Sequence, residues 1–306
     1  MVEKIGSVEL VLDDYPGADL YSDGNVEDLL VEIARRTDPA NFDKVVAQEE
    51  SWPVMYHFSS ARQNILRHFP FTREMKVLEV GSGCGAITGA ITANAGQVDC
   101  VELSRKRSLV NAYRNKDADN LRIFLGNYED VEKHLPNDYD VITLIGVFEY
   151  ASSYIKSPEP YVGFLQQILR HLKPGGKVLM AIENRLGLKY FAGCTEDHTG
   201  NYFEGIEGYN HTRRARTFSK PGLEKVIAAA GAKEWKFFYP YPDYKFPTVI
   251  FSDENLPKPG SLSDNIRNFD RRRLVLFDEK EAFDSLIQDG LFPLFSNSFL
   301  VEITGK

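Results

Sequence analysis

The sequence predicts an α/β fold in which crossover helices cover both faces of a largely parallel sheet. From Lys76 onward, short β-rich runs alternate with helical stretches, the pattern that such a sheet requires. One of the predicted strands, Lys76–Val80, runs directly into a loop of alternating glycines. The chain has 306 residues, 43% of them apolar, which is enough for a sizeable core and excludes a disordered chain.

The first 71 residues are predicted to form an N-terminal helical segment. Val26–Arg36 has apolar residues at helical spacing, and Ser60–Phe69 continues the helical pattern after Trp52-Pro53. We expect this segment to act as a lid on the domain that follows, at residues 72–306.

Seven strands are predicted within that domain. Each is a short apolar run flanked by polar or turn-forming residues. They are Lys76–Val80, Val98–Glu102, Leu121–Leu125, Asp140–Leu144, Lys177–Ile182, Glu234–Tyr239 and Phe299–Ile303.

Helices are predicted between these strands near 86–95, 104–116, 159–172, 219–231 and 279–289. Ser104 is a plausible N-cap, and Asp278-Glu279-Lys280-Glu281 has the form of a capping box. Leu172–Gly176 is expected to end a helix and turn the chain into the next strand. Two stretches without a clean period, at about 184–218 and 240–297, are predicted as insertions that close over a substrate.

Composition narrows the functional class. A net charge of −8 argues against a dedicated nucleic-acid-binding protein, which usually presents a basic face. No apolar run approaches the length of a membrane span. Three scattered cysteines fit neither a disulfide framework nor a zinc site, and acids lie among the first apolar residues where a secretory signal would be apolar. We therefore expect a cytoplasmic protein, and the sequence predicts no metal ligand set.

The glycine loop indicates a nucleoside cofactor. Gly81, Gly83 and Gly85 lie between a strand and a helix, where glycine lets the backbone approach a ligand closely. The next predicted strand ends at Glu102, roughly 20 residues beyond Gly81, where a carboxylate can accept hydrogen bonds from ribose hydroxyls. Gly81-x-Gly83-x-x-Ala86 also satisfies the relaxed dinucleotide fingerprint, so an NAD-dependent oxidoreductase remains an alternative.

These residues resemble the motifs of class I S-adenosylmethionine-dependent methyltransferases. Such proteins have a Rossmann-like sheet of seven-strand type, and the resemblance covers roughly residues 72–240 and the final strand. Asn127 departs from the acid usual at its position, but its carbonyl can still accept the adenine amino proton. A non-catalytic methyltransferase-like binding subunit is the second alternative. The cofactor contacts that the resemblance implies are Glu79, Gly81, Ser82, Gly83, Gly85, Glu102, Leu103, Asn127, Tyr128 and Gly146.

A narrower resemblance concerns the methyl acceptor. Tyr56-His57-Phe58-Ser59 and Glu183–Phe191 are similar to segments of bacterial methyltransferases from surface-polysaccharide loci, which lie beside glycosyltransferases. This resemblance implies O-methylation of a sugar, a nucleotide sugar or another small polar acceptor.

Candidate catalytic residues follow the fourth and fifth predicted strands, because substrates lie beyond the carboxyl ends of the strands in such a sheet. They are Glu149, Glu183 and His198. If the acceptor is a hydroxyl, its deprotonation needs a base, and imidazole titrates near neutrality. We therefore expect His198 to be the base, supported by Asp197. The alternative for His198 is a surface loop histidine. His57 lies in the N-terminal segment, which could fold over the cofactor, and its alternative is a packed, hydrogen-bonded histidine.

Overall fold

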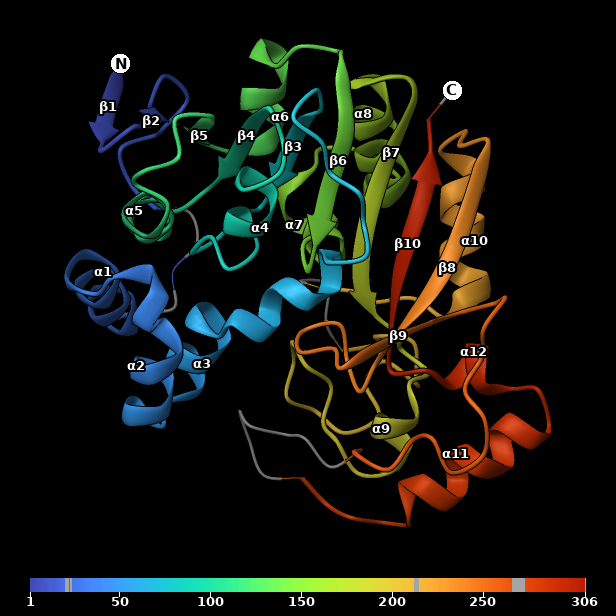
Figure 1. Ribbon diagram of the computed structural model, residues 1–306. Helices are drawn as coiled ribbons and strands as arrows, with labels where there is room; N and C mark the ends of the chain where they lie inside the picture. The colour runs from blue at the N-terminus through green and yellow to red at the C-terminus, as the bar shows by residue number, and fades with distance from the viewer. Residues whose placement is uncertain (20–21, 23, 212–214, 266–272, 306) are drawn as a thin grey trace. The chain divides into compact units, whose positions relative to one another are not determined.

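The computed structural model describes residues 1–19, 22, 24–211, 215–265 and 273–305 (Figure 1). Parts of both predicted insertions, 212–214 and 266–272, therefore lie outside the described residues. The chain divides into two compact units, which are taken in turn below. The first comprises 1–144 and 170–177, and the second comprises 145–169 and 178–306.

The first unit contains a mostly parallel sheet. Its strand order is β1-β2-β5-β4-β3-β6. Pairing is parallel throughout except between β1 and β2, which form an antiparallel hairpin at the edge. The strands are β1 (Val2–Ile5), β2 (Val8–Val11), β3 (Lys76–Val80), β4 (Gln97–Glu102), β5 (Leu121–Leu125) and β6 (Tyr139–Ile145).

The central strand β3 lies between β4 and β6, so the connections leave it in both directions across the sheet. Its side chains Val77, Leu78 and Val80 are almost completely buried, as expected for a strand covered on both faces. A change of winding direction of this kind creates a crevice at the carboxyl ends of the strands, where α/β proteins bind ligands.

Short helices connect and flank these strands in the first unit. Ser104 caps α5 as predicted, since its hydroxyl accepts the N–H of Arg107 at 3.3 Å. The bounds are α1 (Val26–Arg36), α2 (Phe42–Glu49), α3 (Trp52–Phe58), α4 (Thr88–Thr92), α5 (Arg105–Arg114) and α6 (Tyr128–Val131), with 3₁₀ turns at Pro39–Asn41, Ser60–Leu66 and Glu132–His134.

The second unit has the strand order β7-β10-β8-β9. Antiparallel pairing joins β10 to β8 and β8 to β9, and the aromatic run of β8 packs as core, with Phe237 and Tyr239 buried. The strands are β7 (Leu172–Glu183, of which 178–183 belong to this unit), β8 (Glu234–Tyr241), β9 (Val249–Ser252) and β10 (Ser298–Thr304). The helices are α7 (Ala151–Tyr154), α8 (Pro160–Arg170), α9 (Leu188–Phe191), α10 (Lys220–Ala229), α11 (Glu279–Gln288) and α12 (Phe292–Phe295), with a 3₁₀ turn at Phe148–Tyr150.

The fold class is confirmed as mixed α/β, with three corrections. The described residues hold ten strands rather than seven, because β1, β2 and β9 are four-residue strands too short to stand out in sequence. Leu172–Gly176 is not a turn but the start of β7, in which residues 173–175 are exposed and Gly175 has a φ of +78°. The helix predicted near 86–95 is only the five residues of α4.

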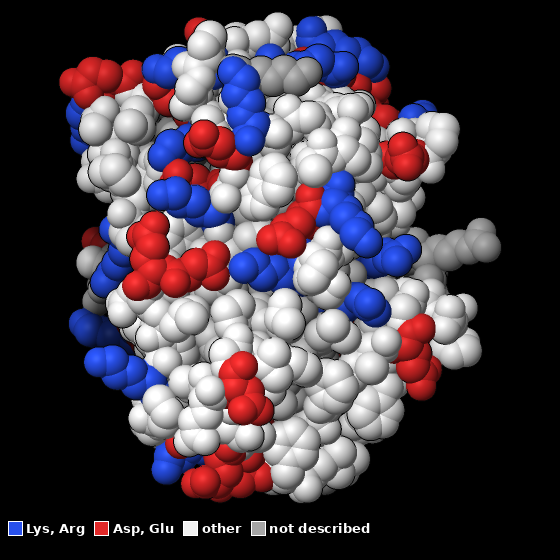
Figure 2. Space-filling view, turned by 90° about the vertical axis from the view of Figure 1, so that its right-hand side faces the viewer, with Lys and Arg blue, Asp and Glu red and all other residues white. Residues whose placement is uncertain are grey.

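Two surface properties bear on function. On the face shown in Figure 2, lysines and arginines are interspersed with aspartates and glutamates, and no broad basic field covers it. Within the described part of the chain, no helix combines the length and the apolar character needed to cross a membrane.

Candidate active site

The glycine loop has the backbone conformation that its sequence predicts. Gly81, Gly83 and Gly85 all have positive φ, at 69°, 53° and 72°. A Cβ at Gly85 would lie 2.3 Å from Oδ1 of Asn111, so this glycine is required by packing. A Cβ at Gly83 would meet no atom within 4 Å. Gly83 therefore borders open space, as a loop that cradles a cofactor requires.

Glu102 is joined directly to this loop at the end of β4. One carboxylate oxygen accepts the N–H of Gly83 at 2.7 Å, and the other accepts the N–H of Ser104 at 2.9 Å. Burial raises the pKa of Glu102, while Arg107 and these N–H groups oppose the shift. Each oxygen retains a second lone pair, so the carboxylate can still accept ribose hydroxyls. The backbone N–H of Leu103, the next residue, also lowers the pKa of this carboxylate.

Glu79 lies behind the loop. Its carboxylate accepts the hydroxyl of Thr88 at 2.6 Å and lies 3.5 Å from Sγ of Cys100. Burial raises its pKa to about 7. These contacts connect β3 with α4 and β4, so Glu79 braces the loop that Ser82 and its neighbouring glycines form. Ser82 is buried, and its N–H donates to the carbonyl of Val101 at 3.3 Å.

The segment after β5 meets the same end of the sheet. The N–H of Gly126 donates to the carbonyl of Glu102 at 3.0 Å, which places Asn127 beside the end of β4. Asn127 is half-buried at the N-cap of α6, and Tyr128 is buried. Thus the first unit brings together every predicted cofactor residue except Gly146. That residue belongs to the second unit, where its N–H donates to the carbonyl of Ala181 at 3.0 Å.

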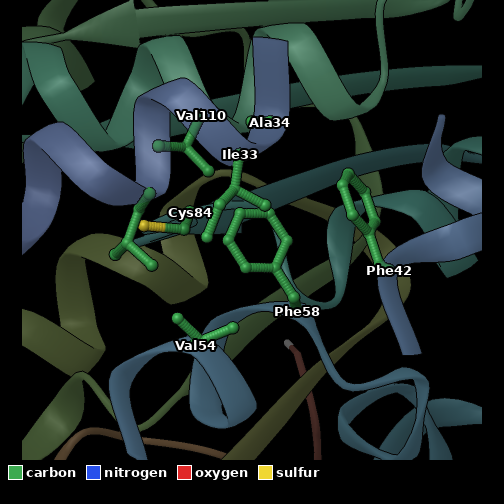
Figure 3. Packing of buried hydrophobic residues seen from close by; sticks show 8 residues of the cluster. Ile33, Ala34, Phe42, Val54, Phe58, Cys84 and Val110 are labelled. Carbon is green, nitrogen blue, oxygen red and sulfur yellow. The ribbon is translucent and has the colours of Figure 1, made fainter. Parts of the chain in front are cut away.

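The N-terminal segment packs directly against the glycine loop. Cys84 lies in a buried apolar cluster with side chains from α1, α2, α3 and α5 (Figure 3). The members labelled in Figure 3 are Ile33, Ala34, Phe42, Val54, Phe58, Cys84 and Val110. Because Cys84 is part of both the loop and this cluster, packing of the segment fixes the position of the loop.

Two charged residues of this region, Arg114 and Asp19, belong to no motif that the sequence alone would reveal. Buried Arg114 donates to the carbonyl of His57 at 2.6 Å and to that of Cys84 at 3.1 Å, which connects the segment to the loop. His57 itself is a packed histidine, and burial together with nearby arginines holds its pKa well below its usual value. Asp19 accepts the N–H of Arg105 at 2.6 Å and the hydroxyl of Ser104 at 3.0 Å, at the start of α5.

The three predicted catalytic residues lie together in the second unit. One ligand atom from each of Glu149, Glu183 and His198 lies within 4.8 Å of the others; we call these three residues the acidic cluster. Glu149 follows β6, Glu183 ends β7 and His198 comes from the insertion after α9. Glu149 and Glu183 are buried, yet one oxygen of each (Oε2) has no hydrogen-bond partner.

His198 is held between two carboxylates. Its Nδ1 lies 2.9 Å from Oε1 of Glu196, and its Nε2 lies 3.5 Å from Oε1 of Glu149. Burial alone would lower the pKa of His198, but these two carboxylates outweigh burial and hold it well above its usual value. Glu196 is fixed in turn by the N–H groups of His198 and Thr199, at 2.8 and 2.7 Å.

The expected support of His198 by Asp197 is wrong, because Glu196 makes that hydrogen bond. Asp197 accepts instead from Lys245 at 2.9 Å, from Lys189 at 3.0 Å and from the Tyr190 hydroxyl at 2.5 Å. Two strong cations next to Asp197 hold its pKa well below its usual range despite burial. Lys245 also pairs with Oε1 of Glu183. Sequence spacing gave no signal for Lys245, which lies 62 residues from Glu183.

Other polar residues near these strand ends have structural roles. The Asn184 amide donates to the carbonyls of Leu294 and Ser296, both at 2.8 Å. Arg185 donates to the carbonyl of Gly205 at 2.9 Å. The ring of Tyr150 lies edge-on to the His198 imidazole, 5.4 Å between centroids. These residues shape the surroundings of the acidic cluster.

Comparison with known proteins agrees with this geometry. A methyltransferase domain family matches residues 78–178, a stretch that contains the glycine loop, Glu102 and Asn127. No curated protein matches the sequence.

Solved structures of low sequence identity resemble the chain. A methyltransferase of Thermotoga maritima is 15% identical, with a TM-score of 0.48 over 87% of this chain and 99% of its own. One from Archaeoglobus fulgidus is 12% identical, with a TM-score of 0.47 over 79% and 92%. Phosphoethanolamine N-methyltransferase 1 of Haemonchus contortus is 14% identical, with a TM-score of 0.48 over 90% and 50%.

The matched family and the loop geometry agree on the cofactor. The glycines, Glu102 and Asn127 that the family match contains are the residues that the structure gathers at one end of the sheet. Residues 78–178 therefore match a methyltransferase domain, and this match together with the loop geometry supports S-adenosylmethionine as the cofactor.

Proposed function

We propose that the protein transfers a methyl group to a hydroxyl of a small polar acceptor, such as a sugar or nucleotide sugar. S-adenosylmethionine supplies the methyl group from a sulfonium centre when it is bound. The residues proposed to hold it are the predicted ones of the first unit. The acidic cluster is proposed to hold the acceptor and to take its proton.

One observation carries this proposal. Oε2 of Glu149 and Oε2 of Glu183 are buried acceptors without a donor. Leaving such oxygens unsatisfied costs free energy, and a bound hydroxyl would satisfy them. Because a neutral hydroxyl is a weak nucleophile, a correctly positioned proton acceptor raises the rate of methyl transfer to it, typically by ~10²–10⁴-fold.

Within the cluster, Glu149 is proposed as the direct proton acceptor. Burial raises the pKa of Glu149, which makes its carboxylate a stronger base than an exposed one. The raised pKa of His198 means that its imidazole carries a proton near neutral pH, so it would stabilise the Glu149 carboxylate by charge. This division of roles differs from the expectation of neutral His198 as base.

The proposal is tested by labelled methyl transfer from S-adenosylmethionine to a panel of acceptors. The panel contains nucleotide sugars, free glycans, hydroxylated metabolites and, as the contrasting class, primary amines. We expect label on a hydroxyl, and turnover about 10²-fold lower in Glu149→Gln with cofactor affinity unchanged. Label only on amines would overturn the proposal. Association with a glycosyltransferase pathway and a cytoplasmic location stay predictions.

A further inference from the structure

We propose that Glu149, Glu183 and His198 bind a divalent metal ion. The inference deepens the proposed function and in its catalytic part rests on it, since the ion would hold the acceptor hydroxyl. With the ion bound, His198 would ligate through an unprotonated ring nitrogen, and the charge of the ion would replace that of the imidazolium beside Glu149. Glu149 would then ligate through Oε2 and accept the proton through Oε1. The sequence alone predicts no metal ligands, because the three residues lie far apart in the chain. The structure brings their ligand atoms within 4.8 Å of one another. When one metal ion lies ~2.0–2.2 Å from each of its ligand atoms, those ligand atoms lie within a similar distance of one another.

The first argument is the unused oxygen on each glutamate. Oε1 of Glu183 is paired with Lys245, and Oε1 of Glu149 faces His198, yet Oε2 of both has no partner. Both side chains are at least 98% buried, so water does not freely solvate these oxygens. A carboxylate that is fixed through one oxygen and free at the other is well prepared to ligate through the free one.

The second argument is the orientation of His198. Metal-binding histidines usually donate the N–H of one ring nitrogen to a carboxylate, which fixes the ring and leaves the other nitrogen for the ion. Here Nδ1 lies 2.9 Å from Oε1 of Glu196, and Nε2 points to the cluster. Glu196 is in turn held by the hydroxyl of Tyr209 at 3.2 Å. The outer contacts that a metal site requires are therefore present.

The third argument is charge. Among the described residues, His198 pairs with Glu149 and Lys245 with Glu183, and each is shared with a second carboxylate, that of Glu196 and Asp197 respectively. Buried carboxylates are stable only when paired or bound to a metal. A divalent ion would supply the additional positive charge between Glu149 and Glu183.

The ligand chemistry selects the ion. Carboxylates suit Mg²⁺ and Mn²⁺, while imidazole suits later transition metals, so the mixed set favours Mn²⁺ over Mg²⁺. Three protein ligands leave coordination positions open for an acceptor oxygen. Coordination lowers the pKa of a hydroxyl and orients it, which is the assistance that methylation of a hydroxyl needs.

The test measures metal binding without an acceptor. The full chain is treated with chelator, and MnCl₂ is titrated by calorimetry and by loss of the free Mn²⁺ electron-paramagnetic-resonance signal. We expect saturable binding, weakened more than ~10-fold in Glu149→Gln and in Glu183→Gln, and by ~10–100-fold in Glu196→Gln. The control is Glu254→Gln, an exposed acid of the second unit, with unchanged Mn²⁺ affinity. Binding of S-adenosylhomocysteine in each variant verifies folding.

A spectroscopic measurement keeps the test decisive even where a variant does not fold. Bound Mn²⁺ in the unaltered protein should show coupling to an imidazole nitrogen, and His198→Asn should abolish it. Absence of binding, or binding without nitrogen coupling, overturns the metal site. Hydroxyl methylation in chelator would overturn the site and leave the proposed function standing. Mn²⁺ binding with transfer only to amines would instead overturn the proposed function.

Discussion

The carboxylate of Glu102 accepts the backbone N–H of Gly83 at 2.7 Å, across 19 residues of sequence. This hydrogen bond joins the two features from which the cofactor was predicted. It fixes the loop while leaving the position of a Gly83 Cβ open. The proposed cofactor site therefore has its loop already fixed by the protein itself, and substitutions at Gly83 and Glu102 test the loop and the carboxylate separately.

The first prediction concerns these two residues. Gly83→Val should abolish S-adenosylhomocysteine binding, because the side chain fills open space beside the loop and strains a positive φ. Glu102→Ala should weaken binding by ~1–3 kcal/mol, the value of hydrogen bonds to a charged group. Calorimetry measures both affinities, and NADH should not bind. Gly260→Val is the matched control, since Gly260 also has a positive φ and open space. Full affinity in Gly83→Val would refute the assignment of the loop.

The second prediction concerns the adenine contact. If the Asn127 carbonyl accepts the adenine amino proton, Asn127→Asp should keep or raise cofactor affinity, because a carboxylate accepts the same bond. Asn127→Leu should lower it, by about 1 kcal/mol. The affinities are compared by calorimetry with S-adenosylhomocysteine. Equal values for all three proteins would mean that the side chain at position 127 does not contact adenine.

The third prediction concerns the link between the N-terminal segment and the loop. Arg114→Met should lower the free energy of unfolding by about 2–4 kcal/mol, because two buried carbonyls lose their donor. Urea denaturation measures this change, and cofactor affinity should fall with it. Arg36→Met, which removes an exposed arginine that pairs with Glu32 of the same helix, is the control and should change little. An Arg114→Met protein as stable as the parent would contradict the role of this link.

The fourth prediction concerns pH. The pKa of Glu79 is about 7 in the folded protein, above its ordinary value of 4.5, so the folded state binds this proton more tightly than the unfolded state. Stability is therefore lost as pH rises from about 4.5 to about 7 and then levels off. In Glu79→Gln the side chain is neutral at every pH. The free energy of unfolding of this variant, minus that of the parent, should therefore rise between about pH 4.5 and about pH 7, by up to about 3 kcal/mol.

Denaturation at several pH values checks this expectation. The matched control is Glu281→Gln, an exposed carboxylate on α11 that stays in water in both states. The pH dependence relative to the parent should be confined to Glu79→Gln. A difference that does not change between pH 5 and pH 8 would show that Glu79 remains charged in the folded protein.

The cofactor region could be predicted because its residues are close in sequence. The loop follows β3 immediately, and Glu102 ends the next strand, so strand order alone brings them to one edge. The acidic cluster could be predicted only as three separate strand-end residues. Its outer contacts depend on Lys245 and Glu196, whose positions follow from the path of the insertions rather than from a local pattern.

The missed strands have a different cause. β1 and β2 are four residues each, and charged residues interrupt their apolar character, Glu3 and Lys4 in β1 and Glu9 in β2. Val8 and Leu10 of β2 are fully buried in the folded protein, where β2 pairs with β5. Local propensity contains no information about such a partner. The wrong prediction for Asp197 has a similar cause. Asp197 is next to His198 in sequence, but its carboxylate accepts from Lys245, which is distant in sequence.

The apolar cluster around Cys84 has a consequence for how the chain can be divided. A protein beginning at residue 72 would leave Cys84 and Val110 uncovered and would remove the His57 carbonyl that Arg114 binds. Exposed apolar surface of that kind promotes self-association. Such a truncated chain should therefore aggregate rather than remain a small cofactor-binding protein. When residues 1–71 and 72–306 are produced as separate chains, we expect a folded species only after the two are mixed.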